Sequence, residues 1–154
     1  MAKLKCGLIQ MAFKGDTSRS PEQIRDVMID AHIPYIDEAG KKGVQVLCFQ
    51  EVFTQPYFCP SQDRKWYAAA EPIPDGHTTR LMQEYAKKHH MVIVVPIYEE
   101  DMPGVYYNTA AVIDADGSYL GKYRKTHIPQ VDPGFYEKFF FKPGDLGYPV
   151  FDTA

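Results

Sequence analysis

Two charged side chains stand where an α/β protein usually places its chemistry. Glu51 stands two residues after the end of the apolar run 44–49, and Lys125 directly follows the run 118–124. If both runs are strands of one sheet, the two charges lie at strand carboxyl ends, where such sheets bind ligands. A glutamate and a lysine brought together there could act as base and acid, activating a nucleophile and stabilising an oxyanion. A structural ion pair closing the end of the sheet is an equally open alternative.

The elements that would position these residues follow from hydrophobic periodicity. Residues 4–10 are a short apolar run that predicts a first strand, and residues 44–49 are apolar enough to predict a strand buried on both faces. Between them, Ser20 stands three residues before Gln23, and Pro21 occupies the first helical position. This spacing predicts a capped helix that begins at Pro21, is kinked at Pro34 and is stopped by Gly40 and Gly43.

The remaining chain continues the alternation. Residues 50–74 form a long connection with four prolines, in which we expect one short helix over 63–70. Residues 78–90 predict a second helix and 91–97 a third buried strand, and the Asp-Gly step between 105–113 and 118–124 predicts a hairpin. The order predicts one α/β domain over residues 1–154, with a further strand beginning at 150–151.

Composition argues against several other classes of protein. The chain has 154 residues, 45% hydrophobic and 24% charged, which is typical of a globular domain. Its formal net charge is −3 and it has no basic run, so we expect no nucleic-acid partner. No run approaches the roughly 18 apolar residues that span a bilayer, and no signal peptide is evident, so we expect a cytoplasmic protein without a membrane partner. No glycine-rich phosphate loop or zinc spacing occurs, so we expect neither a cofactor nor a metal.

The three cysteines do not have the pattern of a disulfide framework or a zinc site, because they are odd in number and unevenly spaced. Cys6 and Cys48 lie inside apolar runs, so we expect them to be buried as small hydrophobic residues. Cys59 is expected to be more exposed. A thiol without a neighbouring base is a poor nucleophile.

Ordered blocks along the chain resemble the nitrilase superfamily of carbon–nitrogen hydrolases. They are Phe49-Gln50-Glu51, the aromatic loop 53–58, Tyr107-Asn108-Thr109-Ala110, and the run 121–129. The segments 134–139 and 143–145 are most similar to the branch of β-ureidopropionases and N-carbamoylputrescine amidases. This resemblance covers essentially the whole chain. It implies the N-terminal half of a four-layer α-β-β-α sandwich, ending before the nucleophilic cysteine of the family.

The resemblance also implies roles for single residues. Glu51 matches the general base, Lys125 the residue that stabilises the tetrahedral intermediate, and Glu137 the second glutamate near the nucleophile. In the family the nucleophile is a cysteine downstream of the lysine, whereas all three cysteines here precede Lys125. Tyr57 is a candidate pocket wall, unless it only packs its loop onto the sheet. His127 is a candidate substrate contact, unless it only bonds backbone in its turn.

Two hypotheses of function therefore stay open. In the first, the chain is part of an amidohydrolase, inactive by itself. The full protein would cleave a small amide or ureido substrate, an N-carbamoyl amine or N-carbamoyl amino acid, as a homo-oligomer without a cofactor. In the second, the chain is a non-catalytic interaction module that retains the fold. A nucleotide-binding domain is disfavoured because no glycine-rich loop follows the first strand.

Overall fold

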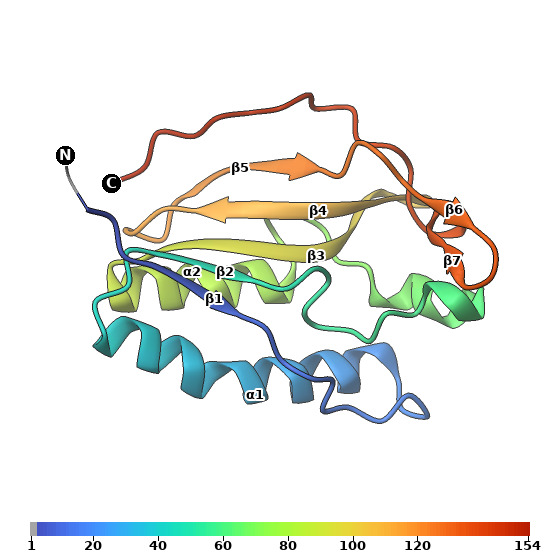
Figure 1. Cartoon of the computed structure of the whole chain (residues 1–154), viewed down its shortest axis with the longest axis horizontal. Helices are drawn as coiled ribbons and strands as arrows, with labels where there is room; N and C mark the ends of the chain where they lie inside the picture. The colour runs from blue at the N-terminus through green and yellow to red at the C-terminus, as the bar shows by residue number, and fades with distance from the viewer. Residues whose placement is uncertain (1–2) are drawn as a thin grey trace.

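The computed structural model describes residues 3–154 and contains a five-stranded sheet (Figure 1). In spatial order its strands are β1 (Cys6–Ile9), β2 (Val46–Phe49), β3 (Val92–Met102), β4 (Val105–Ile113) and β5 (Tyr119–Arg124). The first three strands are parallel, while β4 and β5 are antiparallel to their neighbours. This mixed sheet confirms the expected α/β class and order of elements. The carboxyl ends of β2 and β5 lie at the same end of the sheet.

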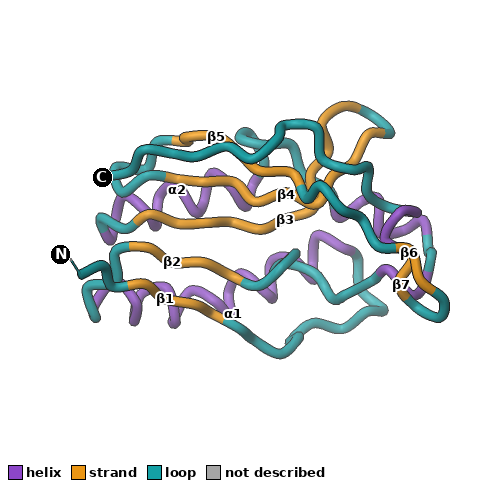
Figure 2. Tube along the Cα trace, turned by 45° about the horizontal axis from the view of Figure 1, so that its top comes forward, coloured by secondary structure: helices purple, strands orange, loops and turns teal. Residues whose placement is uncertain are grey.

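Two helices cover one face of this sheet (Figures 1 and 2). They are α1 (Pro21–Lys41) and α2 (His77–His89). The predicted capping box begins α1: the Ser20 hydroxyl accepts a hydrogen bond from the Gln23 amide, and the Gln23 side chain accepts one from the Ser20 amide. Three short 3₁₀ helices, η1 (Cys59–Ser61), η2 (Arg64–Ala69) and η3 (Glu137–Phe139), and the hairpin of β6 (Gln130–Val131) and β7 (Phe135–Tyr136) complete the fold.

The hydrophobic core consists of two clusters in different parts of the fold. One layer between the helices and the sheet includes Ile36, Leu47 and Met82, each at most 1% exposed. A second, aromatic cluster packs the long connection onto the end of the sheet. In that cluster, Phe58 stacks on Trp66 with ring centroids 5.4 Å apart. Each such side chain stabilises the fold by about 1.5–3 kcal/mol when buried, so the connection beside the strand ends is held in place.

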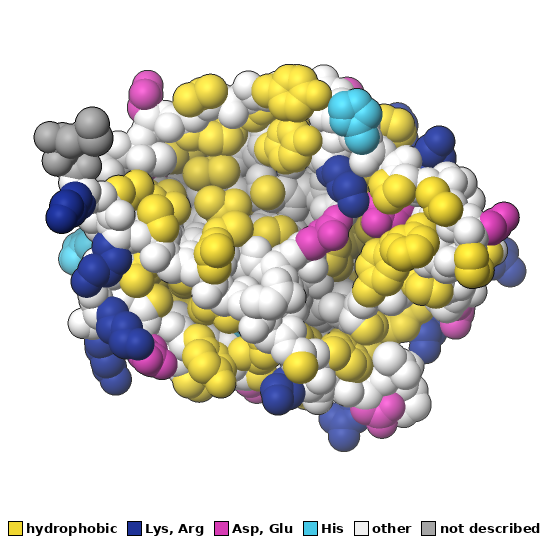
Figure 3. All heavy atoms as spheres, in the orientation of Figure 1, with side chains coloured by type: hydrophobic (Ala, Val, Ile, Leu, Met, Phe, Trp, Pro, Cys, Tyr) yellow, Lys and Arg dark blue, Asp and Glu magenta, His cyan; other side chains and the backbone are white. Residues whose placement is uncertain are grey.

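The other face of the sheet carries no helix among residues 3–154. The strand register places Leu8, Cys48, Val94 and Val112 in one row on it. Leu8 is 83% exposed, and Figure 3 shows hydrophobic side chains gathered over the strands. Cys6 lies on the same face and is exposed, so the expectation that it is buried is wrong. Alternate residues of a strand point to opposite faces, and only one face is covered here.

The last residues follow β5 without pairing to it (Figure 1). Residues 142–154 contain no strand, so the strand expected at 150–151 is not formed. Side chains make the contacts instead: the Phe151 ring occupies the space that a Cβ at Gly121 would need, 2.6 Å away. In residues 3–154, none of the helices is long and apolar enough to cross a membrane.

Candidate active site

Glu51 is presented by a tight turn after β2. Val52 adopts a left-handed backbone with φ of 48°, which is rare for a β-branched residue and is found where the surrounding structure enforces it. Phe53 is fully buried, and its amide donates to the Pro96 carbonyl oxygen at 3.3 Å. The turn is therefore anchored on the sheet, and the Glu51 carboxylate lies at the carboxyl end of β2, as the sequence predicts.

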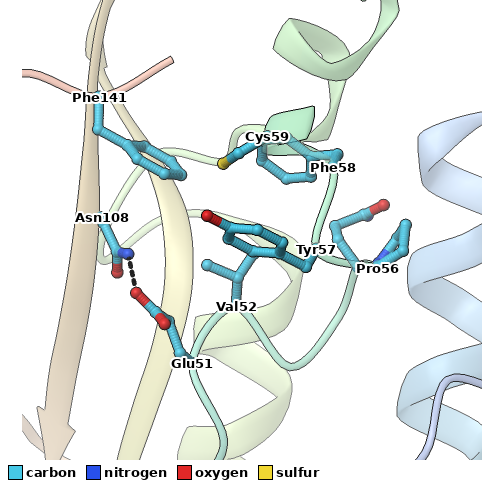
Figure 4. Close-up of a pocket in the computed structure, with 9 residues that line it drawn as sticks. Glu51, Val52, Pro56, Tyr57, Phe58, Cys59, Asn108 and Phe141 are labelled. Carbon is cyan, nitrogen blue, oxygen red and sulfur yellow. Dashed lines mark hydrogen bonds between the residues drawn. The ribbon is translucent and has the colours of Figure 1, made fainter. Parts of the chain in front are cut away.

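Lys125 is brought to Glu51 through Asn108 on β4. The pairing of Thr109 with Arg124 sets Asn108 beside Lys125, whose amide donates to the Asn108 carbonyl oxygen at 2.8 Å. The Asn108 side-chain amide donates to Glu51 Oε1 at 2.5 Å (Figure 4), and Lys125 Nζ donates to the same oxygen at 2.9 Å. No role was predicted for Asn108, although its amide in a largely apolar strand, within the block 107–110 that resembles the family, is a signal that could have marked it.

Glu137 completes the group from η3. Lys125 Nζ donates to Glu137 Oε2 at 2.7 Å, and the Tyr57 hydroxyl donates to Glu137 Oε1 at 3.2 Å. The Glu137 side chain is only 5% exposed. The structure thus brings together the two glutamates, the lysine and Tyr57, which are far apart in the sequence.

The two carboxylates differ in what they can do. Both oxygens of Glu137 accept hydrogen bonds, whereas Lys125 and Asn108 both donate to Oε1 of Glu51. Within residues 3–154, Glu51 Oε2 accepts no hydrogen bond, and the side chain is 52% exposed. Glu51 therefore has a free oxygen that can take a proton, while Glu137 is suited to hold the lysine.

The charge of Lys125 is secured by its neighbours. Partial burial alone would lower the pKa of the ammonium, but the hydrogen bonds to Glu137 and Glu51 outweigh burial and raise the pKa above its usual value. Lys125 is consequently a cation at neutral pH. A fixed ammonium of this kind can stabilise an oxyanion.

Glu51, Tyr57 and Asn108 border a small pocket with about 40 Å³ of free space (Figure 4). Lys125 and Glu137 contact these residues but are not among those that line it. The pocket is lined by Glu51, Val52, Gln55, Pro56, Tyr57, Phe58, Cys59, Asn108 and Phe141. Burial, together with the neighbouring Cys59 and Glu137, raises the pKa of the Tyr57 hydroxyl, so Tyr57 is a protonated donor at the pocket. His127 is exposed and is not among the lining residues, and its contact with a substrate stays a prediction. No cluster suited to a metal ion occurs among the described His, Cys, Asp and Glu residues.

Cys59 lies inside the pocket wall rather than at the surface. It is 2% exposed, so the expectation of an exposed thiol is wrong. Cys59 is buried because it belongs to the aromatic cluster, in which the neighbouring Phe58 packs on Trp66. Burial and the negative charge of Glu137 raise the pKa of the Cys59 thiol to about 12.

This environment predicts slow alkylation of Cys59. At pH 8 its thiolate fraction is about 10³-fold below that of a thiol with the ordinary pKa of 9.0. We expect iodoacetamide to label the exposed Cys6 first and Cys59 at least about a hundredfold more slowly. Peptide mass spectrometry over a time course measures both rates in one sample. Equal alkylation rates of Cys6 and Cys59 in the folded protein would contradict a buried Cys59 with a raised thiol pKa.

Gly144 lets its own segment of backbone pack closely against the backbone of Arg124 and Lys125. Its amide donates to the Lys125 carbonyl oxygen at 2.8 Å, and a Cβ there would lie 2.1 Å from the Arg124 carbonyl oxygen. We expect Gly144→Ala to lower the free energy of unfolding by about 1–3 kcal/mol, because backbone must shift to admit the methyl group. Urea denaturation tests this, with exposed Lys142→Ala as the control that should change stability by less than about 0.5 kcal/mol. A neutral Gly144→Ala variant would contradict the contact.

A lysine held between two glutamates at the end of a mixed α/β sheet is an arrangement suited to a hydrolase. The chain belongs to the carbon-nitrogen hydrolase family, whose model matches residues 17–154. Its fold is that of the N-terminal half of the nitrilase-type sandwich, confirming the expected fold class. Over 98% of this chain, the crystal structure of a carbon-nitrogen hydrolase from Helicobacter pylori G27 aligns with a TM-score of 0.85 and 33% identity.

Curated relatives carry more specific names. A β-ureidopropionase from Arabidopsis thaliana is 42% identical over 98% of this chain, and an N-carbamoylputrescine amidase from the same plant is 44% identical over 77%. The matched region is 37% and 39% of those two proteins and 48% of the Helicobacter structure. The chain therefore spans less than half the length of the relatives described here.

Proposed function

We propose that these residues form part of the active site of a hydrolase that cleaves a C–N bond in an N-carbamoyl amine or N-carbamoyl amino acid. The observation that carries the proposal is Lys125 Nζ held between Glu51 at 2.9 Å and Glu137 at 2.7 Å beside a pocket. The names of two relatives, β-ureidopropionase and N-carbamoylputrescine amidase, support the substrate class.

The proposed chemistry uses a cysteine outside residues 1–154. Glu51 Oε2 takes the thiol proton, and the thiolate attacks the carbonyl carbon. Lys125 stabilises the resulting oxyanion, and the departing amine takes up the proton that Glu51 had accepted. The Glu51 carboxylate, ionised again, then activates the water that releases the enzyme-bound acyl group. For a ureido group R–NH–CO–NH₂, one water is consumed, and R–NH₂, NH₃ and CO₂ are released.

The cysteines of this chain are poorly suited to that attack. Cys6 and Cys48 lie on the bare face of the sheet, and neither lines the pocket. Cys59 lines the pocket, but the pKa of its thiol is raised to about 12, so almost none is thiolate at neutral pH. The positions of all three support a nucleophile supplied by residues outside this chain.

A joined chain tests the proposal: residues 1–154 followed by the C-terminal part of the Arabidopsis β-ureidopropionase. We expect it to release ammonia from N-carbamoyl-β-alanine or from N-carbamoylputrescine. Propionamide serves as the simple-amide control. A folded joined chain that hydrolyses only the simple amide would reject the substrate class, and one that hydrolyses none of the three compounds would reject the proposed function.

We further propose that the complete protein is a homo-oligomer in solution. The family resemblance of the sequence supports this proposal. The exposed apolar row around Leu8 does not, because it lies on the face that the second sheet of the sandwich would cover. Light scattering of the joined chain tests it, and a monomer across the micromolar range would reject the proposal.

A further inference from the structure

Arg124, the neighbour of Lys125, is the centre of a buried ionic cluster. Its side chain is 5% exposed and contacts three acidic groups. NH2 lies 2.6 Å from Glu99 Oε1 and 2.5 Å from Asp101 Oδ1, and NH1 lies 2.9 Å from Asp145 Oδ1. The guanidinium also stacks 3.8 Å over the Tyr107 ring. Arg124 is not among the residues that line the pocket beside Glu51.

The three acidic partners join Arg124 to different parts of the fold. Glu99 and Asp101 belong to β3, which is already linked to β5 through the sheet. Asp145 belongs to the segment after η3, and its carboxylate also accepts from the Tyr107 hydroxyl at 3.0 Å. Only the contact with Asp145 therefore ties this segment to the ion cluster among the described residues.

Two backbone hydrogen bonds accompany this tie. The Gly144 amide donates to the Lys125 carbonyl oxygen at 2.8 Å, and the Lys142 amide donates to the Tyr106 carbonyl oxygen at 2.9 Å. Together with the Arg124–Asp145 pair, they close the chain between Lys125 and Gly144 into a loop. This loop carries Glu137, whose carboxylate must return to within 2.7 Å of Lys125 Nζ.

We propose that Arg124 and Asp145 are positioning residues, which clasp residues 126–144 against β5 so that the Glu137 carboxylate meets Lys125. Neither residue lines the pocket, so their effect passes through Lys125 and Glu137. The clasp has a catalytic meaning only if the proposed hydrolase function is correct, but its geometry can be tested without catalysis.

The test compares Asp145→Asn with the matched variant Asp101→Asn in the 154-residue chain. Each removes one carboxylate charge from Arg124, but only Asp145 holds the loop. The Asp145 side chain is 55% exposed, so its replacement should leave the chain folded. NMR gives two readouts, the hydrogen-exchange rate of the Gly144 amide and the pH titration of the Lys125 side chain. The Lys125 signal is assigned by its absence from the spectrum of the Lys125→Arg variant.

We expect Asp145→Asn to speed exchange of the Gly144 amide by about tenfold or more and to lower the pKa of Lys125 by about one pH unit. Asp101→Asn should leave the exchange rate of the Gly144 amide and the pKa of Lys125 close to their values in the unsubstituted protein. Tyr107→Phe, which removes only the hydroxyl bond to Asp145, should shift both readouts in the direction of Asp145→Asn by a smaller amount.

The clasp would be rejected if Asp145→Asn left both readouts unchanged, or if Asp101→Asn changed them equally. In the second case the effect would come from the charge near Arg124 rather than from loop closure. Neither readout depends on turnover, so a joined chain without hydrolase activity would reject the proposed function and leave the result on the clasp intact.

Discussion

Replacing Lys125 with methionine is expected to lower kcat/KM of the joined chain by about 10²–10³-fold, because one preorganised donor to an oxyanion contributes about that factor. Lys125 Nζ is the cation that contacts both site carboxylates. Methionine keeps much of the length of the side chain and removes the charge. Ammonia release from N-carbamoyl-β-alanine measures the loss. Lys138→Met, at an exposed position next to Glu137, is the control and should retain activity.

The same substitution also affects stability, and a second variant separates the two effects. Lys125→Met leaves the buried Glu137 carboxylate without its cation, which should cost about 2 kcal/mol of unfolding free energy. Adding Glu137→Gln removes that stranded charge and should recover most of the stability. Activity should stay absent in the double variant. Recovered activity would show that Lys125 is only a structural partner of Glu137.

The largest stability effect is expected at Glu99. Its side chain is fully buried and accepts hydrogen bonds from Arg124, Lys122 and Thr109. Glu99→Gln removes the charge and places amide hydrogens against these donors, so two cations lose their buried partner. We expect urea denaturation at pH 7 to show a loss of about 3 kcal/mol in the free energy of unfolding.

Asp101→Asn is the matched control for this loss. Asp101 contacts the same guanidinium, but its side chain is 32% exposed, so solvent screens the pair. Its replacement should cost no more than about 1 kcal/mol. Similar losses in the two variants would contradict the central position of Glu99 in the cluster.

Glu99 also predicts how stability depends on pH. Burial alone would raise the pKa of its carboxyl, but the hydrogen bonds from Arg124, Lys122 and Thr109 outweigh burial and hold the pKa below its ordinary value of 4.5. The folded state therefore binds this proton less readily than the unfolded state. Its contribution is present above pH 4.5 and is lost as pH falls through the folded pKa. Urea denaturation between pH 3 and 7 should show a shallower decline for Glu99→Gln, and identical slopes would contradict this assignment.

Much of the fold followed from local patterns in the chain. The capping box at Ser20, the apolar runs of β2 and β3 and the Asp-Gly step at 116–117 are short-range features, and the structure forms the expected elements around them. The positions of Glu51 and Lys125 at strand ends followed for the same reason. A side chain directly after a strand must leave the sheet at that edge, whatever the rest of the fold does.

Only the tertiary structure decided which side chains meet and which are covered. The contact of Glu137 with Lys125 depends on a clasped loop, and the role of Asn108 depends on the register of β4 with β5. Cys59 is buried because aromatic rings from distant segments pack around it. Cys6 is exposed because its side chain lies on the face of the sheet that no described helix covers. The alternation of a strand shows that it has two faces, but not which of them is covered. The sequence by itself thus determined the elements and the two charges at their ends, since these depend on near neighbours. The distances and burial that would turn those charges into a site depend on packing between segments far apart in the chain.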